Sequence, residues 1–287
     1  VQECNRCDAR MGLHQRRNRL ACHHCGAERA LPETCPDCDQ DLIPVGLGNE
    51  RLEEQLGKLF PDYPLVRIDR DTTRRRGAME AMLKDIRAGK SRILLGTQML
   101  TKGHDFPDVT CVGIIDSDQG LFGTDFRSSE RLAQSLLQVA GRAGRGDRPG
   151  EVWVQTWYPD HPLLQTLLQR GYGAFAREAL GERDAAGWPP FSHIALLRAE
   201  ATDRTKLFDF LEAARRAATM PVGIGLLGPA SSPMERRSGR YRGQLLIQAA
   251  DRQTLGRFLH GWRALVTALP QARRTRWSLD IDPVELF

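Results

Sequence analysis

Residues 138 to 145 read Gln-Val-Ala-Gly-Arg-Ala-Gly-Arg, and this stretch ends a predicted helix. Apolar residues recur at helical spacing ahead of it, so we expect the helix over residues 129–140, capped by one of the two serines before Glu130. Beyond the helix, glycines flank Arg142 and Arg145 and would let the backbone approach a ligand closely. The stretch therefore predicts a helix that presents two guanidinium groups to an anion.

Arg142 and Arg145 have the chemistry that phosphoryl transfer needs. A planar guanidinium group suits phosphate oxygens. Delivered across a cleft to a γ-phosphate, it stabilises the charge that develops during transfer and raises the rate by about 10³ to 10⁵. A basic helix end that offsets the helix macrodipole is the structural alternative, but it does not explain the glycine spacing. We therefore predict a catalytic role for both arginines.

The sequence around this stretch, residues 44–175, alternates short apolar runs with helical segments. That alternation is typical of an α/β fold in which crossover helices cover a parallel sheet. Several runs are continuously apolar, as strands buried on both faces are, and Cys111 within one of them is expected to be core packing. The strands are predicted at residues 65–68, 93–95, 109–115 and 151–156.

Residues 1–43 are rich in Cys, His and Arg and have little apolar pattern, so this segment needs a metal to hold a shape. It contains three C-x-x-C pairs, each of which places two sulfurs on one tight turn as tetrahedral Zn²⁺ requires. The candidate ligands are Cys4, Cys7, Cys22, Cys25, Cys35 and Cys38. The first two pairs have the spacing of one closed zinc site, and the third pair then lacks partners in this chain.

The alternatives for this segment are free thiols in a reducing cell, or His14, His23 and His24 as ligands. In an Arg-rich loop beside cysteine turns, we expect these histidines to be solvated. The chain opens on Val1, close to the first cysteine, and we expect it to be an excised fragment whose missing cysteine pair lies upstream.

A second boundary is predicted at residues 187–190, Gly-Trp-Pro-Pro, which cannot continue a helix. Residues 176–287 form the third predicted domain. Its expected elements are strands at 194–200, 224–229, 244–248 and 277–281 and helices at 205–218 and 253–269. Their order, β-α-β-β-α-β, is that of a split βαβ or ferredoxin-like α+β domain.

The positive charge of the chain is concentrated in this third domain. Residues 191–287 hold 15 Lys and Arg against 9 Asp and Glu, while the net charge of the whole chain is +5. Residues 236–242, with four arginines around Tyr241, are predicted to be a loop that contacts phosphates and stacks one base. A solvated hairpin tip is the alternative, and the charge asymmetry favours nucleic acid as the partner.

The bulk composition excludes a membrane-spanning chain, because no apolar run approaches the roughly 18 residues needed. Hydrophobic residues make up 41% of the chain and charged residues 27%, as in globular proteins. No signal peptide opens the sequence, so we expect a cytoplasmic location.

The stretch at 138–145 resembles the sixth motif of superfamily 2 helicases, and its surroundings resemble one family within them, the PriA primosomal helicases. The further segments that carry this resemblance are Val45–Glu50, Arg67–Asp71, Gly96–Met99, Lys102–Pro107, Asp280–Pro283 and the three cysteine pairs. They extend over essentially the whole chain.

This resemblance implies a RecA-like second helicase lobe between a zinc module and a domain that engages stalled replication forks. It implies an ATP- and Mg²⁺-dependent helicase that moves 3′ to 5′, with two Zn²⁺ per full-length protein. DNA forks, single-stranded DNA, primosome proteins and single-stranded DNA-binding protein are the implied partners. The residues implied to contact or sense the nucleotide are Gly103, Asp105, Gln138, Arg142 and Arg145.

Two segments superficially resemble the missing part of an ATP site. Residues 89–91, Gly-Lys-Ser, end like a phosphate loop, but Lys84 stands where that loop needs glycine, and a strand follows the segment instead of preceding it. Asp116 and Asp118 end an apolar run without a phosphate loop ahead of it and are expected to shape the lobe interface. We therefore expect this chain alone to hydrolyse no ATP. A non-enzymatic zinc-containing adaptor for nucleic acid or protein is the competing hypothesis.

Overall fold

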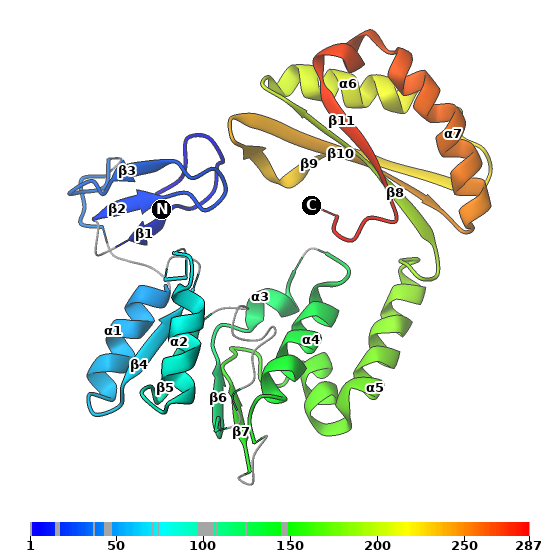
Figure 1. Ribbon diagram of the computed structural model, residues 1–287. Coiled ribbons are helices and arrows are strands. Elements are labelled where there is room, and N and C mark those ends of the chain that lie inside the picture. The colour runs from blue at the N-terminus through cyan, green and yellow to red at the C-terminus, as the bar shows by residue number, and fades with distance from the viewer. Residues whose placement is uncertain are drawn as a thin grey trace.

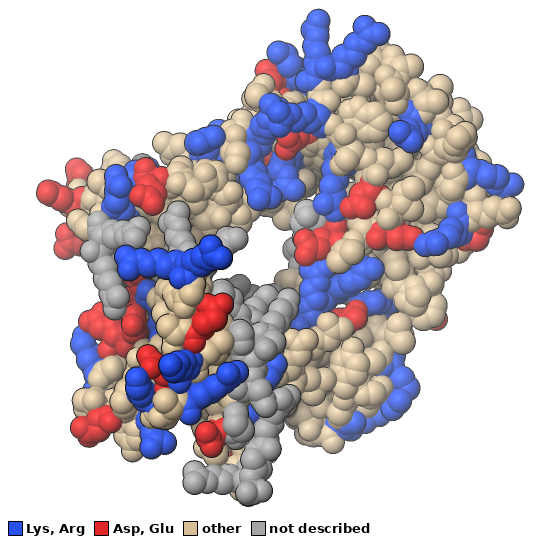
Figure 2. Space-filling model, in the orientation of Figure 1, with Lys and Arg blue, Asp and Glu red and all other residues tan. Residues whose placement is uncertain are grey.

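The computed structural model describes residues 2–14, 18–36, 38–42, 48–69, 72–73, 75–96, 106, 108–123, 125–144 and 149–286. Three parts follow one another along the chain: the cysteine module (residues 2–42), the α/β lobe (residues 48–185) and the C-terminal domain (residues 186–286). They lie around a central opening, which is visible in Figure 2.

The cysteine module contains a three-stranded antiparallel sheet. Its strands are β1 (Gly12–His14), β2 (Arg19–Ala21) and β3 (Glu28–Ala30). Cysteines form its buried cluster, with only small and partly buried apolar side chains packed against them. A core of this size does not stabilise a fold by apolar burial, which agrees with the expectation that a metal holds the module together.

The α/β lobe has parallel strand pairs, as its sequence predicts. In chain order its elements are α1 (Asn49–Leu59), β4 (Leu65–Ile68), α2 (Ala78–Arg87), β5 (Ile93–Gly96), β6 (Cys111–Ile114), α3 (Asp118–Leu121), α4 (Ser128–Ala140), β7 (Glu151–Val154) and α5 (Pro162–Ala185). Among the described residues, β4 pairs with β5 and β6 pairs with β7, each in parallel (Figure 1).

Helix α4 lies between the β6–β7 strand pair and α5. Ala133 and Leu136 on α4 pack with Leu164 and Phe175 of α5 in one buried cluster, and Ile114 at the end of β6 contacts it. This packing fixes the helix that ends in the arginine stretch.

Two expectations from the sequence are wrong in this lobe. Arg127 occupies the N-cap of α4, without a side-chain capping bond, and Cys111 is exposed because β6 exposes alternate residues.

The C-terminal domain has the predicted βαββαβ order. Its elements are β8 (His193–Ala201), α6 (Arg204–Arg216), β9 (Ile224–Arg237), β10 (Arg240–Ala249), α7 (Arg252–Ala268), the 3₁₀ helix η2 (Pro270–Arg274) and β11 (Arg276–Ile281). The strands form one antiparallel sheet in the order β11-β8-β10-β9. Helices α6 and α7 cover one face of this sheet (Figure 1), where Leu197, Phe210 and Trp262 lie in the core. The opposite side of the sheet, called the open face below, is covered by no helix of the described residues.

The predicted arginine loop is instead the tip of a long hairpin. Arg236 and Arg237 belong to β9, and Arg240 and Arg242 to β10. Only the two residues at positions 238–239 form the turn, and both have positive φ, 53° at the serine and 81° at the glycine. Positive φ at both central positions is typical of a type I′ turn, which matches the twist of the two flanking strands.

Candidate zinc centre, motor arginine and basic sheet face

The first two cysteine pairs form one cluster. The Sγ atoms of Cys4, Cys7, Cys22 and Cys25 all lie within 4.8 Å of one another, and the distance from Cys4 Sγ to Cys25 Sγ is 3.7 Å. Four thiolates at about 2.3 Å from one Zn²⁺ lie about 3.8 Å from each other, so the cluster fits this ion. Cys4, Cys7 and Cys22 are buried, as the ligands of a structural site are.

Backbone hydrogen bonds shape each pair in the same way. In each, the N–H of the first cysteine donates to the carbonyl five residues later, and its own carbonyl accepts from the N–H four residues later. The first bonds join Cys4 to Ala9, Cys22 to Ala27 and Cys35 to Gln40, and the second join Asp8 to Cys4, Gly26 to Cys22 and Asp39 to Cys35. Asp8, Gly26 and Asp39 also share a positive φ. The third pair therefore has the turn of a metal-binding pair, although among the described residues it joins no group of three or more ligands.

Electrostatics shift the pKa values of two of the clustered thiols in opposite directions. Burial raises the pKa of Cys7 to about 12, although the backbone N–H of Ser238 opposes this. Burial also raises the pKa of Cys22, but the N–H groups of Cys25 and His24, with neighbouring thiols, outweigh it and lower that pKa to about 7. A cation that binds all four sulfurs must therefore displace at least the proton of Cys7 at neutral pH.

The hairpin tip of the C-terminal domain contacts this cluster. The N–H of Ser238 donates to Cys7 Sγ at 3.2 Å, and the N–H of Gly239 donates to the carbonyl of Arg6 at 2.7 Å. The guanidinium of Arg236 pairs with Asp8 at 2.7 Å. Arg236 is thus bound within the chain, which removes one of the four arginines that were expected to contact phosphates.

The structure places Arg142 and Gln138 at the C-terminal end of α4. The N–H of Arg142 donates to the carbonyl of Val139, and the N–H of Gly144 donates to the carbonyl of Val109, both at 2.9 Å. The second bond ties the arginine stretch to the segment before β6. Gln138 is exposed and Arg142 is half-buried. The other predicted nucleotide residues, Gly103, Asp105 and Arg145, lie outside the described residues.

Neither candidate for an ATP site has the right surroundings. Lys90 follows α2 instead of preceding a helix, and its ammonium pairs with Asp85 at 2.7 Å. A carboxylate oxygen of Asp118 accepts from the backbone N–H of Trp157 at 3.0 Å, and the other accepts from the hydroxyl of Thr156. Asp118 therefore links the ends of β6 and β7 inside the lobe.

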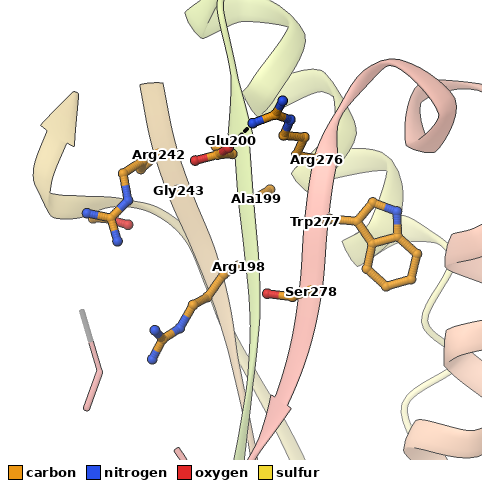
Figure 3. Close-up of a pocket in the computed structure, with 9 residues that line it drawn as sticks. Arg198, Ala199, Glu200, Arg242, Gly243, Arg276, Trp277 and Ser278 are labelled. Atoms are coloured by element: carbon orange, nitrogen blue, oxygen red, sulfur yellow. Dashed lines mark hydrogen bonds and ion pairs between the residues drawn. The ribbon is translucent and has the colours of Figure 1, made fainter. Parts of the chain in front are cut away.

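The open face carries a row of charges, of which the sequence analysis singled out only Arg242. Arg242 on β10 and Arg276 on β11 both lie opposite Glu200 on β8, and Arg198 occupies the next row. These side chains line a pocket of about 320 Å³ (Figure 3). Lys and Arg side chains also border part of the central opening in Figure 2. The alternation of side chains along β8 could have placed Arg198 and Glu200 on one face from the sequence alone. That Arg242 and Arg276 lie beside them follows only from the pairing register of β8 with β10 and β11, which the sequence does not reveal.

Arg242 is the most distinctive residue of this pocket. Burial lowers its pKa, and the nearby charges of Arg237 and Arg198 add to the effect. Within the part of the chain that the structure describes, Arg242 forms no hydrogen bond or ion pair, whereas Arg276 pairs with Glu200 at 3.4 Å. A half-buried guanidinium repelled by like charges is stabilised by an anion, so the pocket is suited to phosphate.

Comparison with known proteins gives matches over all three parts. Residues 4–29 match the PriA DNA helicase Cys-rich region, residues 45–147 the helicase conserved C-terminal domain, and residues 184–284 the primosomal protein N C-terminal domain. The replication restart protein PriA of Haemophilus influenzae is 46% identical over 100% of this chain and 39% of its own length. The protein of the same name from Bacillus subtilis is 40% identical over 99% of this chain and 36% of its own length. The chain belongs to the PriA family.

This chain spans less than half the length of these PriA relatives. The matched PriA Cys-rich region contains the four clustered cysteines and stops before Cys35, whereas the helicase match contains Gln138 and Arg142. Among solved structures, a de novo designed protein, Foldit4, aligns with 32% of this chain and 97% of its own at 11% identity and a TM-score of 0.24, a similarity too weak to indicate a shared fold. No helix in the described residues has both the length and the apolar character to cross a membrane.

Proposed function

We propose that this chain is the C-terminal portion of an ATP-dependent 3′ to 5′ DNA helicase that recognises stalled replication forks and starts primosome assembly. The observation that carries the proposal is the position of Arg142, at the end of a helix packed between a parallel strand pair and α5. A helix end of this kind holds a guanidinium rigidly at the edge of the lobe. The similarity to PriA proteins along the whole chain supports the same assignment.

In this proposal, Arg142 and Arg145 stabilise the charge that develops on the γ-phosphate. ATP with Mg²⁺ supplies the transferred phosphoryl group, and a phosphate loop, which this sequence does not contain, would hold most of the nucleotide. Gln138, which lies on α4 one turn before Arg142, contacts the same nucleotide. Gly103 and Asp105 link nucleotide and DNA. The arginines act on charge present mainly in the transition state, so they contribute to turnover more than to binding.

Zinc has a structural role in the proposal. One Zn²⁺ binds Cys4, Cys7, Cys22 and Cys25, and a second binds Cys35 and Cys38 together with a cysteine pair outside this chain. The full-length protein would then hold two ions. The turn shared by all three pairs supports the second site, because a preformed turn already supplies two of the four ligands.

We propose that the open face of the C-terminal domain binds the phosphate backbone of DNA. Arg242 and Arg276 lie on one row of this face, on either side of Glu200, and Arg198 lies on the next row, which leaves a strip of net positive charge along three strands. Such a strip supplies sequence-independent affinity, as fork recognition by structure requires. Primosome proteins and single-stranded DNA-binding protein are further partners, and the protein acts in the cytoplasm at the nucleoid.

The adaptor hypothesis is not favoured, because an adaptor has no use for a guanidinium held at the end of a packed helix. The deciding experiment measures ATP hydrolysis by the full-length protein with and without forked DNA, and by this chain alone. We expect DNA-stimulated hydrolysis and 3′ to 5′ unwinding only from the full-length protein. Hydrolysis by this chain alone, or none by the full-length protein, would contradict the proposal.

A further inference from the structure

The residues after β11 form a tail, residues 282–286, that crosses from the C-terminal domain to the α/β lobe (Figure 1). The guanidinium of Arg127 donates to the carbonyls of Pro283 at 2.8 Å and Val284 at 2.9 Å. Arg131 donates to the same Val284 carbonyl at 2.7 Å. The tail is therefore bound through its backbone by two arginines, one at the N-cap and one in the first turn of α4.

A buried carboxylate completes this contact. One oxygen of Asp125 accepts from the backbone N–H of Leu286 at 3.1 Å, and the other accepts from the N–H of Arg127 at 2.8 Å. Asp125 and Leu286 are both buried, and Pro283 is fully buried. Buried hydrogen bonds that satisfy both partners fix geometry more strictly than exposed ones, so the tail and the start of α4 are held in one arrangement.

A second connection reaches the same end of α4. Trp188, in the segment between α5 and β8, stacks on Phe126 with ring centroids 5.2 Å apart and planes 2° apart. Arg183 on α5 lies over the same Phe126 ring and pairs with Glu130 in the first turn of α4. Next to the tryptophan, the carbonyl of Gly187 accepts from the hydroxyl of Ser192 and from the side-chain amide of Gln248 on β10.

Arg198 links this contact with the open face. It lines the pocket of Figure 3, and its guanidinium also donates to the tail carbonyl of Glu285 and pairs with Asp280 at 3.5 Å. An anion in the pocket would attract Arg198 and so compete with its bond to the tail. A ligand shifts a conformational equilibrium only through contacts that differ between the two states, and the bond from Arg198 to Glu285 would be such a contact if an anion drew Arg198 away.

We propose that the tail and the start of α4 couple DNA bound at the open face to Arg142 at the opposite end of the same helix. Helix α4 has 13 residues, so this rigid element spans about 20 Å. Arg127 is thus a positioning residue, which acts on Arg142 through α4 and touches neither nucleotide nor DNA. The inference rests on the proposed function, because it needs both a DNA site on this face and a motor role for Arg142.

The test measures DNA stimulation of ATP hydrolysis in the full-length protein, for Arg127→Ala and for a variant that lacks residues 282–287. Arg177→Ala removes an exposed arginine from α5 of the same lobe and is the matched control. We expect the ratio of DNA-stimulated to basal hydrolysis to fall about fivefold or more in both test variants. Basal hydrolysis should stay at the wild-type level, and DNA affinity should not fall, because loosening the tail removes the competitor for Arg198. The control should behave as wild type.

Hydrogen exchange of residues 282–286, with and without a DNA duplex, gives a readout that does not need hydrolysis. We expect DNA to change this exchange in the wild type and in the Arg177→Ala control. An unchanged stimulation ratio in both test variants would overturn the inference, and so would an equal loss of basal and stimulated rates. Hydrogen exchange in the tail that is the same with and without DNA would also overturn it. No hydrolysis by the wild type, with exchange that still responds to DNA, would instead refute the proposed function.

Discussion

The backbone N–H of Ser238 donates a hydrogen bond to the Sγ of Cys7 at 3.2 Å, so the C-terminal domain contacts a cysteine of the zinc cluster directly. Donors of this kind stabilise a thiolate and fix the orientation of a metal ligand. The contact joins the third part of the chain to the first, while the tail joins the third part to the second. Zinc binding and the placement of the C-terminal domain are therefore linked.

Metal analysis tests the cluster itself. We expect about one tightly bound Zn²⁺ per chain, since a structural site needs four ligands and the described residues contain one such set. Cys22→Ser should lose this ion, whereas Cys111→Ser, which changes an exposed cysteine outside the cluster, should keep it. A wild-type chain with well under one zinc would refute the assignment.

The hairpin should slow zinc release. Arg236→Ala removes the pair with Asp8 that holds the hairpin against the cluster, and it should speed the transfer of zinc to a coloured chelator by about tenfold, the lower end of what such outer contacts contribute to affinity. Arg237→Ala is the matched control, because this neighbouring arginine is exposed and has no ion pair within the described residues. Equal release rates in both variants and the wild type would show that the hairpin leaves the metal unaffected.

Acid should weaken zinc binding, with a sign that follows from the thiol pKa values. The pKa of Cys7 is raised to about 12 in the metal-free cluster, so this thiol is protonated at pH 7 and loses its proton when zinc binds. Cys22, with a pKa of about 7, joins it as pH falls below neutrality. We expect proton release on zinc addition and an affinity that declines more steeply below pH 7, both measurable by competition titration. An affinity independent of pH would contradict this account.

DNA binding by the C-terminal domain should depend on salt through the open face. Arg242 supplies one phosphate contact, and Arg198 and Arg276 supply two more when they exchange their carboxylate partners, Asp280 and Glu200, for phosphate. Three such contacts predict a slope of log K against log salt of about −2.7 for duplex DNA. Arg242→Ala should reduce the slope by about one unit. Arg215→Ala, an exposed arginine on α6 over the opposite face, should leave it unchanged. Equal slopes for all three proteins would place the DNA contacts elsewhere.

The sequence predicts local features of this molecule well. Two cysteines on one turn are a local arrangement, so their spacing predicted the pairs, and the residues that form the C-terminal strands and helices follow from short apolar patterns. The expected parallel strands of the α/β lobe are confirmed as well. In these cases the residues that decide the structure are near neighbours in the chain.

Contacts between distant segments were not predictable in this way. Arg236 looked like a phosphate ligand, because nothing near it in sequence shows that its hairpin ends at Asp8 of the cysteine module. The sequence analysis assigned no role to Arg127 or Asp125, because their partners lie about 160 residues later in the tail. Such contacts depend on how whole domains pack. They pair charged side chains that the sequence alone suggests are available for a ligand.

The most direct test of the central claim is the rate of ATP hydrolysis by full-length Arg142→Ala and Arg142→Lys, with Arg177→Ala as the control. A guanidinium that acts on the transition state should be worth about 10³ or more in turnover, with little effect on the Michaelis constant or on DNA affinity. Lysine keeps the charge but not the planar fork, so it should restore only a small part of the rate. Turnover that stays near the wild-type value in Arg142→Ala would contradict the account.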